Sequence, residues 1–295
     1  MSASKEILDI GVLIVNGLLM MMVGMELQPR HFAALAQRRL AAIVLFAGQV
    51  TVLPLLGLLV ARMLSLPPPI TAGILLLAAC PVGDIANLYT LLGRGNLALS
   101  VAMNAGTCLL SMLTMALVFP LYEMFLGERF VFAVPTAALV GRLLQMVVLP
   151  VLAGMLLRRL APGWSARRAG HFRNASVVGI IFLVAYVLVT QQSLLAMEWK
   201  VTAIAGGSFM ALGLLAGAAF GRLLNLSADD ILTCGILFSV RHVGLAMAIA
   251  ITLLHRVEYA VFAVVYFLTE VPLLLAFVAV ARRRQGLQMT EPGEA

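Results

Sequence analysis

The sequence predicts an all-α polytopic membrane protein, and three observations lead to this fold class. Of the 295 residues, 62% are hydrophobic and only 11% are charged, whereas about 25% of an ordinary soluble domain is charged. The apolar residues are gathered into runs long enough to cross roughly 30 Å of hydrocarbon as helices. The connections between the runs are short, so residues 1–295 are expected to form a single transmembrane unit without an extramembrane domain.

Nine apolar runs are expected to form the transmembrane helices. In chain order they are 8–24, 40–64, 70–92, 97–121, 136–157, 175–191, 201–223, 229–254 and 259–281. The first run is too long for a signal peptide and no small-x-small cleavage site follows it, so it is expected to remain as a helix. The third run contains Pro81 and Gly83, and the eighth contains the polar pair Arg241 and His242. Both runs are therefore expected to be interrupted.

The basic residues indicate how these helices are oriented. Thirteen arginines lie on one side of the expected membrane, whereas the other side holds only Lys5, Arg62, Arg129, Lys200 and Arg256. Because basic loop residues favour the cytoplasmic side, we expect a multi-pass protein of the cell inner (plasma) membrane, with its N-terminus outside and its C-terminus in the cytoplasm. Topology accounts for the net charge of +7, and no nucleic-acid partner is expected.

The order of the helices is that of an inverted repeat. Helices one to four and six to nine form two blocks, which run in opposite directions because the fifth helix separates them. This topology is common in secondary transporters, in which interrupted helices at corresponding positions mark the binding site. The third helix of each block is the one expected to be interrupted. Two continuous, kinked helices with buried polar pairs are the alternative.

Arg241 is the most unusual residue of the chain. A guanidinium near the centre of a bilayer costs several kcal/mol and needs a partner. Asp84 is expected to form an ion pair with it, and Gln49 or the substrate are the alternative partners. For Asp84 itself, proton transfer or capping of a half-helix N-terminus are the alternatives. His242 could titrate during transport, because an imidazole changes charge near physiological pH, or be hydrogen-bonded in place. Glu270, just before Pro272, could compensate Arg241, relay a proton or make a structural hydrogen bond.

Four runs of residues resemble motifs of the bile acid:sodium symporter family. They are CPVGDIAN at 80–87, RGNLALS at 94–100, VVLP at 147–150 and GLA at 244–246. Their order and spacing cover nearly the whole chain, which resembles the nine-helix form of the family.

The resemblance implies two domains. The panel domain would contain the helices at 8–24, 136–157 and 175–191. The core domain would contain those at 40–64, 70–92, 97–121, 201–223, 229–254 and 259–281. The two discontinuous helices would cross near the membrane midplane, substrate would bind between core and panel, and transport would follow alternating access.

The family's sodium ligands carry over only in part. Gln49 matches a ligand of the second sodium site, whereas Asn87 and Ser100 match two ligands of the first. Asn104 replaces a threonine ligand of the first site and could still coordinate. Ala86 replaces a serine, so that oxygen is lost.

Two further substitutions remove charge and oxygen from the expected sodium sites. Leu237 stands where the resemblance places a glutamate shared by both sites, and Arg241 stands where it places a glutamine of the second. Because a guanidinium offers a cation only donors and a repelling charge, the second sodium site is expected to be absent. A residual site at Asn87, Ser100 and Asn104 stays open.

These features predict a secondary transporter of small organic anions, in particular carboxylates, because Arg241 and half-helix N-termini suit a carboxylate. Sodium coupling is expected to be weakened or lost, and proton coupling through Asp84, His242 or Glu270 is open. A transport-inactive membrane sensor or binding scaffold is one alternative, and an arsenite- or auxin-type efflux carrier is another.

Enzyme motifs are missing from the sequence. It contains no phosphate-binding glycine loop, no His-x-x-x-His pair and no nucleophile elbow. The chain is therefore expected to be neither an enzyme nor the holder of a cofactor. Its expected partners are an organic anion and the lipid bilayer, and the sequence leaves the oligomeric state open.

Overall fold

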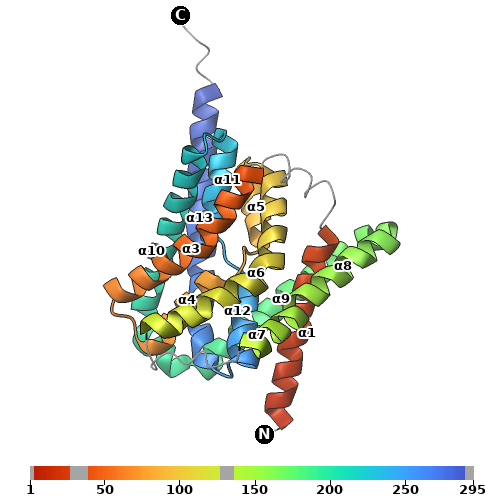
Figure 1. Ribbon diagram of the computed structural model, residues 1–295, viewed down its shortest axis with the longest axis vertical. Coiled ribbons are helices and arrows are strands. Elements are labelled where there is room, and N and C mark those ends of the chain that lie inside the picture. The colour runs from red at the N-terminus through yellow and green to blue at the C-terminus, as the bar shows by residue number, and fades with distance from the viewer. Residues whose placement is uncertain (1–2, 27–38, 127–135, 290–295) are drawn as a thin grey trace, which may run out of the picture.

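The computed structural model describes residues 3–26, 39–126 and 136–289, and helices make up nearly all of these ranges (Figure 1). The elements in chain order are α1 (Ala3–Glu26), α3 (Arg39–Met63), α4 (Pro68–Ala79), α5 (Ile85–Leu92), α6 (Leu97–Leu126), α7 (Thr136–Leu143), the π-helix η2 (Leu144–Val148), α8 (Leu149–Leu160), α9 (Pro162–Thr190), α10 (Gln192–Leu223), α11 (Ala228–Ser239), α12 (Val243–Ala248), the π-helix η3 (Ile249–Leu253), the 3-10 helix η4 (Val257–Tyr259) and α13 (Ala260–Met289).

The chain is an all-α polytopic membrane protein, as the sequence predicts. Within the described ranges, five helices are long and apolar enough to cross a membrane, or six if the bent helix α6 counts as one span. Ile10–Glu26 of α1, the helix α4, and α12 together with η3 are apolar but shorter. Every apolar run expected from the sequence overlaps with these helices, and two of the runs are interrupted.

Helix α6 is bent, which the sequence did not indicate. Its parts Leu97–Ser111 and Leu113–Tyr122 meet at 60°. The hydroxyls of Thr107, Ser111 and Thr114 each donate to the backbone carbonyl three residues earlier, at 2.7–3.0 Å. Such side-chain bonds compete with the helical ladder and favour bending.

The helices form two groups (Figure 1). The first, called the α1 group, consists of α1, η2, α8 and α9, and α1 packs mainly against α8 and α9. The second, called the α13 group, contains α3 to α6 and α10 to α13, with α10 packed against α3, α11 and α13. This division decides where a cavity can form.

Two glycines let α1 and α8 approach closely. A Cβ built on Gly24 would clash with the backbone oxygen of Val151 in α8. In the same way, a Cβ on Gly154 would clash with the backbone oxygen of Met21 in α1. Backbone atoms cannot turn aside as side chains do, so the spacing of the two helices depends on both glycines.

Replacing Gly24 with alanine is therefore expected to lower the melting temperature of the purified protein. Overpacking of this kind costs about 1–3 kcal/mol. Gly17→Ala is the matched control in the same helix, because a Cβ there has no neighbour within 4 Å and alanine favours a helix over glycine. A thermal-shift measurement in detergent should show a loss for Gly24→Ala alone. Equal melting temperatures would contradict the close α1–α8 contact.

Candidate functional site

The two interrupted helices meet at their unwound segments. The first break lies between α4 and α5, where Cys80 has the extended backbone (φ −66°, ψ 155°) that a following proline favours, here Pro81. The second break lies between α11 and α12. Val82 of the first break and Arg241 of the second form an antiparallel β-bridge. The N–H of Val82 also donates to the Thr107 hydroxyl of α6 at 3.2 Å.

Backbone hydrogen bonds hold the two breaks together. The N–H of Gly83 donates to the carbonyl of Val240 at 3.3 Å, and the N–H of His242 donates to the carbonyl of Pro81 at 3.0 Å. Each break thus satisfies backbone groups that the other exposes, which is what buried, non-helical chain requires. The expectation of two interrupted helices is confirmed, and they cross.

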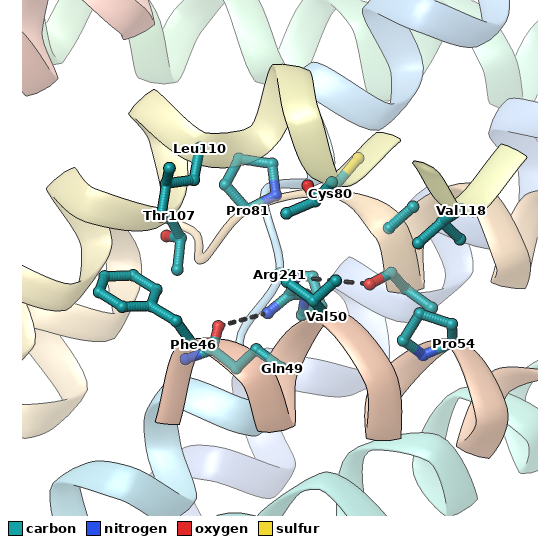
Figure 2. Close-up of a pocket in the computed structure, with 13 residues that line it drawn as sticks. Phe46, Gln49, Val50, Pro54, Cys80, Pro81, Thr107, Leu110, Val118 and Arg241 are labelled. Carbon is teal, nitrogen blue, oxygen red and sulfur yellow. Dashed lines mark hydrogen bonds between the residues drawn. The ribbon is translucent and has the colours of Figure 1, made fainter. Parts of the chain in front are cut away.

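The guanidinium of Arg241 lies at the carboxyl end of α4 (Figure 2). Nη1 donates to Oε1 of Gln49 in α3 at 3.2 Å, and Nη2 donates to the carbonyl oxygen of Ala78 at 3.4 Å. The residue is only 4% exposed. A positive charge is favourable there, because the last carbonyls of a helix carry partial negative charge.

The expected ion pair between Arg241 and Asp84 is wrong. The Arg241 nitrogens take neutral oxygens of α3 and α4 instead, and no ion pair joins Arg241 to an acid in the described part of the chain. The Asp84 carboxylate instead faces His242 and Asn104. The Gln49 amide, which is the alternative partner within the protein, and the end of α4 satisfy the arginine instead.

A small chamber of about 30 Å³ adjoins the guanidinium (Figure 2). Its walls come from α3, α4 and α6, and they include Phe46, Gln49, Cys80, Pro81, Thr107 and Arg241. Gln49 is the residue that the family resemblance assigns to the second sodium site. Its Oε1 already accepts from the Arg241 guanidinium, so a fixed positive charge lies at this position.

Asp84 and His242 face each other across the crossing. Nε2 of His242 lies 3.6 Å from Oδ2 of Asp84. Nδ1 of His242 accepts a hydrogen bond from the N–H of Leu245 at 3.0 Å and so caps α12. Because Nδ1 is an acceptor, the proton of the neutral imidazole is on Nε2, facing Asp84. The other oxygen of Asp84 accepts from Nδ2 of Asn104 at 3.1 Å, and no capping bond to α5 is made.

The candidate ligands of the first sodium site lie on α5 and α6. The Ser100 hydroxyl donates to Oδ1 of Asn87 at 2.8 Å and accepts from the Thr90 hydroxyl at 3.2 Å. Oδ1 of Asn104 accepts from the Cys108 thiol at 3.4 Å. Amide oxygens keep a second lone pair, so this set retains oxygens that could contact a cation.

A large cavity of about 1260 Å³ separates the two helix groups. From the α1 group, Leu19, Met22, Val177, Ile180 and others line it. From the α13 group, the crossing contributes Gly83, Asp84, Arg241, His242 and Gly244, and α5, α6 and α13 contribute Asn87, Val101, Phe267 and Glu270. Glu26 and Arg158 line it where α1 and α8 end. The walls are mainly apolar, and polar groups gather at the crossing.

Glu270 of α13 is completely buried and lines this cavity. Neither of its carboxyl oxygens has a hydrogen-bond partner among the described residues. One turn earlier, the Tyr266 hydroxyl donates to the carbonyl of Ser239 at the end of α11. Glu270 therefore does not pair with Arg241, and no structural hydrogen bond holds its side chain.

A model of the Sodium Bile acid symporter family matches residues 13–199. The chain belongs to the sodium bile acid symporter family. The family resemblance predicted from the motifs is thus confirmed.

Relatives within the sodium bile acid symporter family come from plants, bacteria and animals. A probable chloroplastic sodium/metabolite cotransporter of Arabidopsis thaliana is 30% identical over 209 residues, 70% of this chain and 51% of that protein. An uncharacterized sodium-dependent transporter of Bacillus subtilis is 28% identical over 240 residues, 79% of this chain and 71% of that protein. The human sodium/bile acid cotransporter 4 is 32% identical over 104 residues, 35% of this chain and 24% of that protein. The match thus spans about half of the plant relative, and these names are those of membrane transporters rather than enzymes.

The positions of two arginine side chains could not be predicted from the sequence. By sequence, Arg158 is only one of the thirteen basic residues outside the apolar runs. In the fold it lines the large cavity, and its Nη1 donates to the carbonyl of Met25 at 3.3 Å, which ties α8 to α1. The contact of Arg241 with the Ala78 carbonyl was also missed, although an arginine facing the end of a half-helix is a recognisable signal.

Proposed function

We propose that this chain is a secondary transporter of small organic anions, in particular carboxylates, that works by alternating access. The large cavity carries this proposal, since it reaches from the polar crossing to the ends of α1 and α8. By the distribution of basic residues, the end with Glu26 and Arg158 is cytoplasmic. The conformation described here therefore faces the cytoplasm, in the cell inner (plasma) membrane.

The two helix groups supply the moving parts. The α1 group, with α7, corresponds to the panel domain, and the α13 group corresponds to the core. Within this group, α1 packs closely against α8 through Gly24 and Gly154. Substrate changes sides when the core moves against the panel and the cavity closes toward the cytoplasm while opening outside.

An anion with an apolar body suits the large cavity. Its walls include Leu19, Met22, Ile180 and Phe267, and His242 presents Nε2–H as a donor at the crossing. Arg158 adds positive charge at the cytoplasmic end. Both Nη atoms of Arg241 are bonded to Gln49 and Ala78, so this side chain mainly supports the crossing. Its Nε–H has no partner among the described residues and is the donor left for the substrate.

Sodium coupling is weakened or lost in this proposal. Arg241 acts as a fixed cation in place of the second sodium ion, and the buried Leu237 brings no carboxylate. Sodium needs several oxygen ligands, and only the set at Asn87, Ser100 and Asn104 remains.

Uptake by proteoliposomes tests this function. Radiolabelled 2-oxoisovalerate and glycocholate are suitable probes, because both stay anionic and cross lipid slowly. We expect saturable uptake of at least one probe, unchanged when potassium replaces sodium at constant ionic strength. Val101→Trp, which fills the cavity from α6, should abolish uptake, whereas Leu113→Trp, at a 61% exposed position of the same helix, should not.

Three outcomes would contradict the proposal. A steep, cooperative sodium dependence would restore the sodium sites. Binding of the probes without flux would indicate a sensor or scaffold, and flux of arsenite but not of carboxylates would indicate an efflux carrier of that type.

A further inference from the structure

We propose that Glu270 is a proton-binding site of the large cavity, and that the proton bound there crosses the membrane together with the substrate anion. The inference rests on the proposed function and names its coupling ion. It is carried by the position of this one carboxyl group and by the groups that surround it.

The burial of Glu270 means that its carboxyl group needs a compensating positive charge. The residue is 0% exposed, and both oxygens lack partners in the described part of the chain. An ionised carboxylate without water, donors or a counter-ion is strongly disfavoured, whereas the neutral acid is tolerated far better. The group therefore needs either a cation beside it or a proton on it.

Among the described residues, no ion pair or hydrogen bond brings a cation to Glu270. On the same helix, Tyr266 lies one turn away, and its hydroxyl donates to the backbone carbonyl of Ser239. From α5, Tyr89 lies close enough to interact electrostatically with Glu270, and its hydroxyl is buried without a partner. Two phenols cannot neutralise a carboxylate, and neither hydroxyl donates to Glu270.

The charged groups of the cavity are also engaged elsewhere. Asp84 and His242 face each other at 3.6 Å. The Arg241 guanidinium is bonded on the small-chamber side of the crossing. Glu26 and Arg158 lie at the ends of their helices, where the latter holds the carbonyl of Met25. A proton is thus the cation that Glu270 can hold.

A proton at Glu270 and an anion in the cavity favour each other. An ionised Glu270 would repel a carboxylate in a site of low dielectric constant. The protonated acid removes this repulsion, and its O–H can donate to the substrate carboxylate. By linkage, each ligand then raises the affinity for the other by the same factor. Glu270 takes the proton from water on the side where substrate enters and returns it to water on the opposite side, so proton and anion move together.

Infrared spectroscopy tests whether Glu270 carries a proton, and this measurement needs no substrate. The purified wild-type protein at neutral pH should show the C=O stretch of a protonated carboxyl group, shifted in D₂O. Glu270→Gln should lose this band, and Glu198→Gln in α10 should keep it. Absence of the band in the wild-type protein, or its persistence in Glu270→Gln, would overturn the assignment.

Uptake measurements distinguish proton coupling from movement of the probe alone. An inward acid gradient should drive accumulation of the 2-oxoisovalerate or glycocholate probe, with alkalinisation of pyranine in an acidified external medium. Glu270→Gln carries a permanently neutral side chain, so it should lose gradient-driven accumulation and the accompanying alkalinisation, and any exchange of the probe that it retains should no longer depend on pH. Glu198→Gln should behave like the wild-type protein in both measurements. Wild-type flux that ignores the pH gradient would overturn proton coupling and leave the proposed function intact. If neither probe crosses at all, the proposed function fails, and the infrared band still decides whether Glu270 holds a proton.

Discussion

Sodium is expected to raise the melting temperature of the double variant Leu237→Glu/Arg241→Gln, while leaving that of the wild-type protein unchanged. Removing the guanidinium releases two oxygens that now accept from it, Oε1 of Gln49 at 3.2 Å and the Ala78 carbonyl at 3.4 Å. The new glutamate and glutamine would restore the residues that the family resemblance places at this site. Together these groups supply the oxygens and the negative charge that sodium requires.

The expected shift in melting temperature follows from sodium binding to the folded protein and not to the unfolded chain. A ligand at a hundred times its dissociation constant stabilises the fold by about 2.7 kcal/mol. Thermal-shift curves in sodium chloride and potassium chloride at equal ionic strength would measure it. Each single variant is a control: Arg241→Gln lacks the carboxylate, and Leu237→Glu keeps the guanidinium. A double variant that melts equally in both salts would show that Arg241 does not stand in a cation's place.

Replacing Gly83 with alanine is expected to destabilise the protein strongly and to abolish transport. An added Cβ would lie 2.6 Å from the backbone oxygen of Arg241 and 3.0 Å from its carbonyl carbon. The two unwound segments would have to separate, which breaks the 3.3 Å bond from the Gly83 N–H to Val240. Overpacking and lost buried hydrogen bonds together cost about 2 kcal/mol or more.

Gly207→Ala in α10 is a suitable control for this prediction. The nearest atom to its added Cβ is the end of the Leu273 side chain at 3.7 Å, an ordinary contact. Melting temperature in detergent and probe uptake in proteoliposomes would both be measured. If Gly83→Ala melts and transports like Gly207→Ala, the two breaks do not depend on contact through their backbones.

The interruptions of the helices could be predicted from the sequence because their causes are local. Pro81 restricts the residue before it and cannot donate a hydrogen bond, and Gly83 tolerates close approach. Likewise, the polar pair Arg241 and His242 stands in an apolar run and marks the second break. These rules act within a few residues, so no knowledge of the fold is needed.

The partners of the charged groups could not be predicted in the same way. Asp84, Gln49 and a backbone carbonyl were all chemically suitable for Arg241, and only the crossing decides which of them the guanidinium reaches. The His242–Asp84 contact depends on the same crossing. The isolation of Glu270 is a property of several helices together, and a sequence shows a carboxyl group but not the lack of donors around it.

Arg241 has one further consequence for the carrier cycle. An ion that arrives from solution can also leave, and the carrier then exists in a loaded and an empty form whose ratio follows the ion's concentration. A guanidinium tethered through its own backbone never dissociates, so the crossing of α4–α5 with α11–α12 is permanently loaded. In the proposed cycle, the substrate-free carrier would return across the membrane without waiting for an ion to leave this position, and the sodium gradient would do no work there.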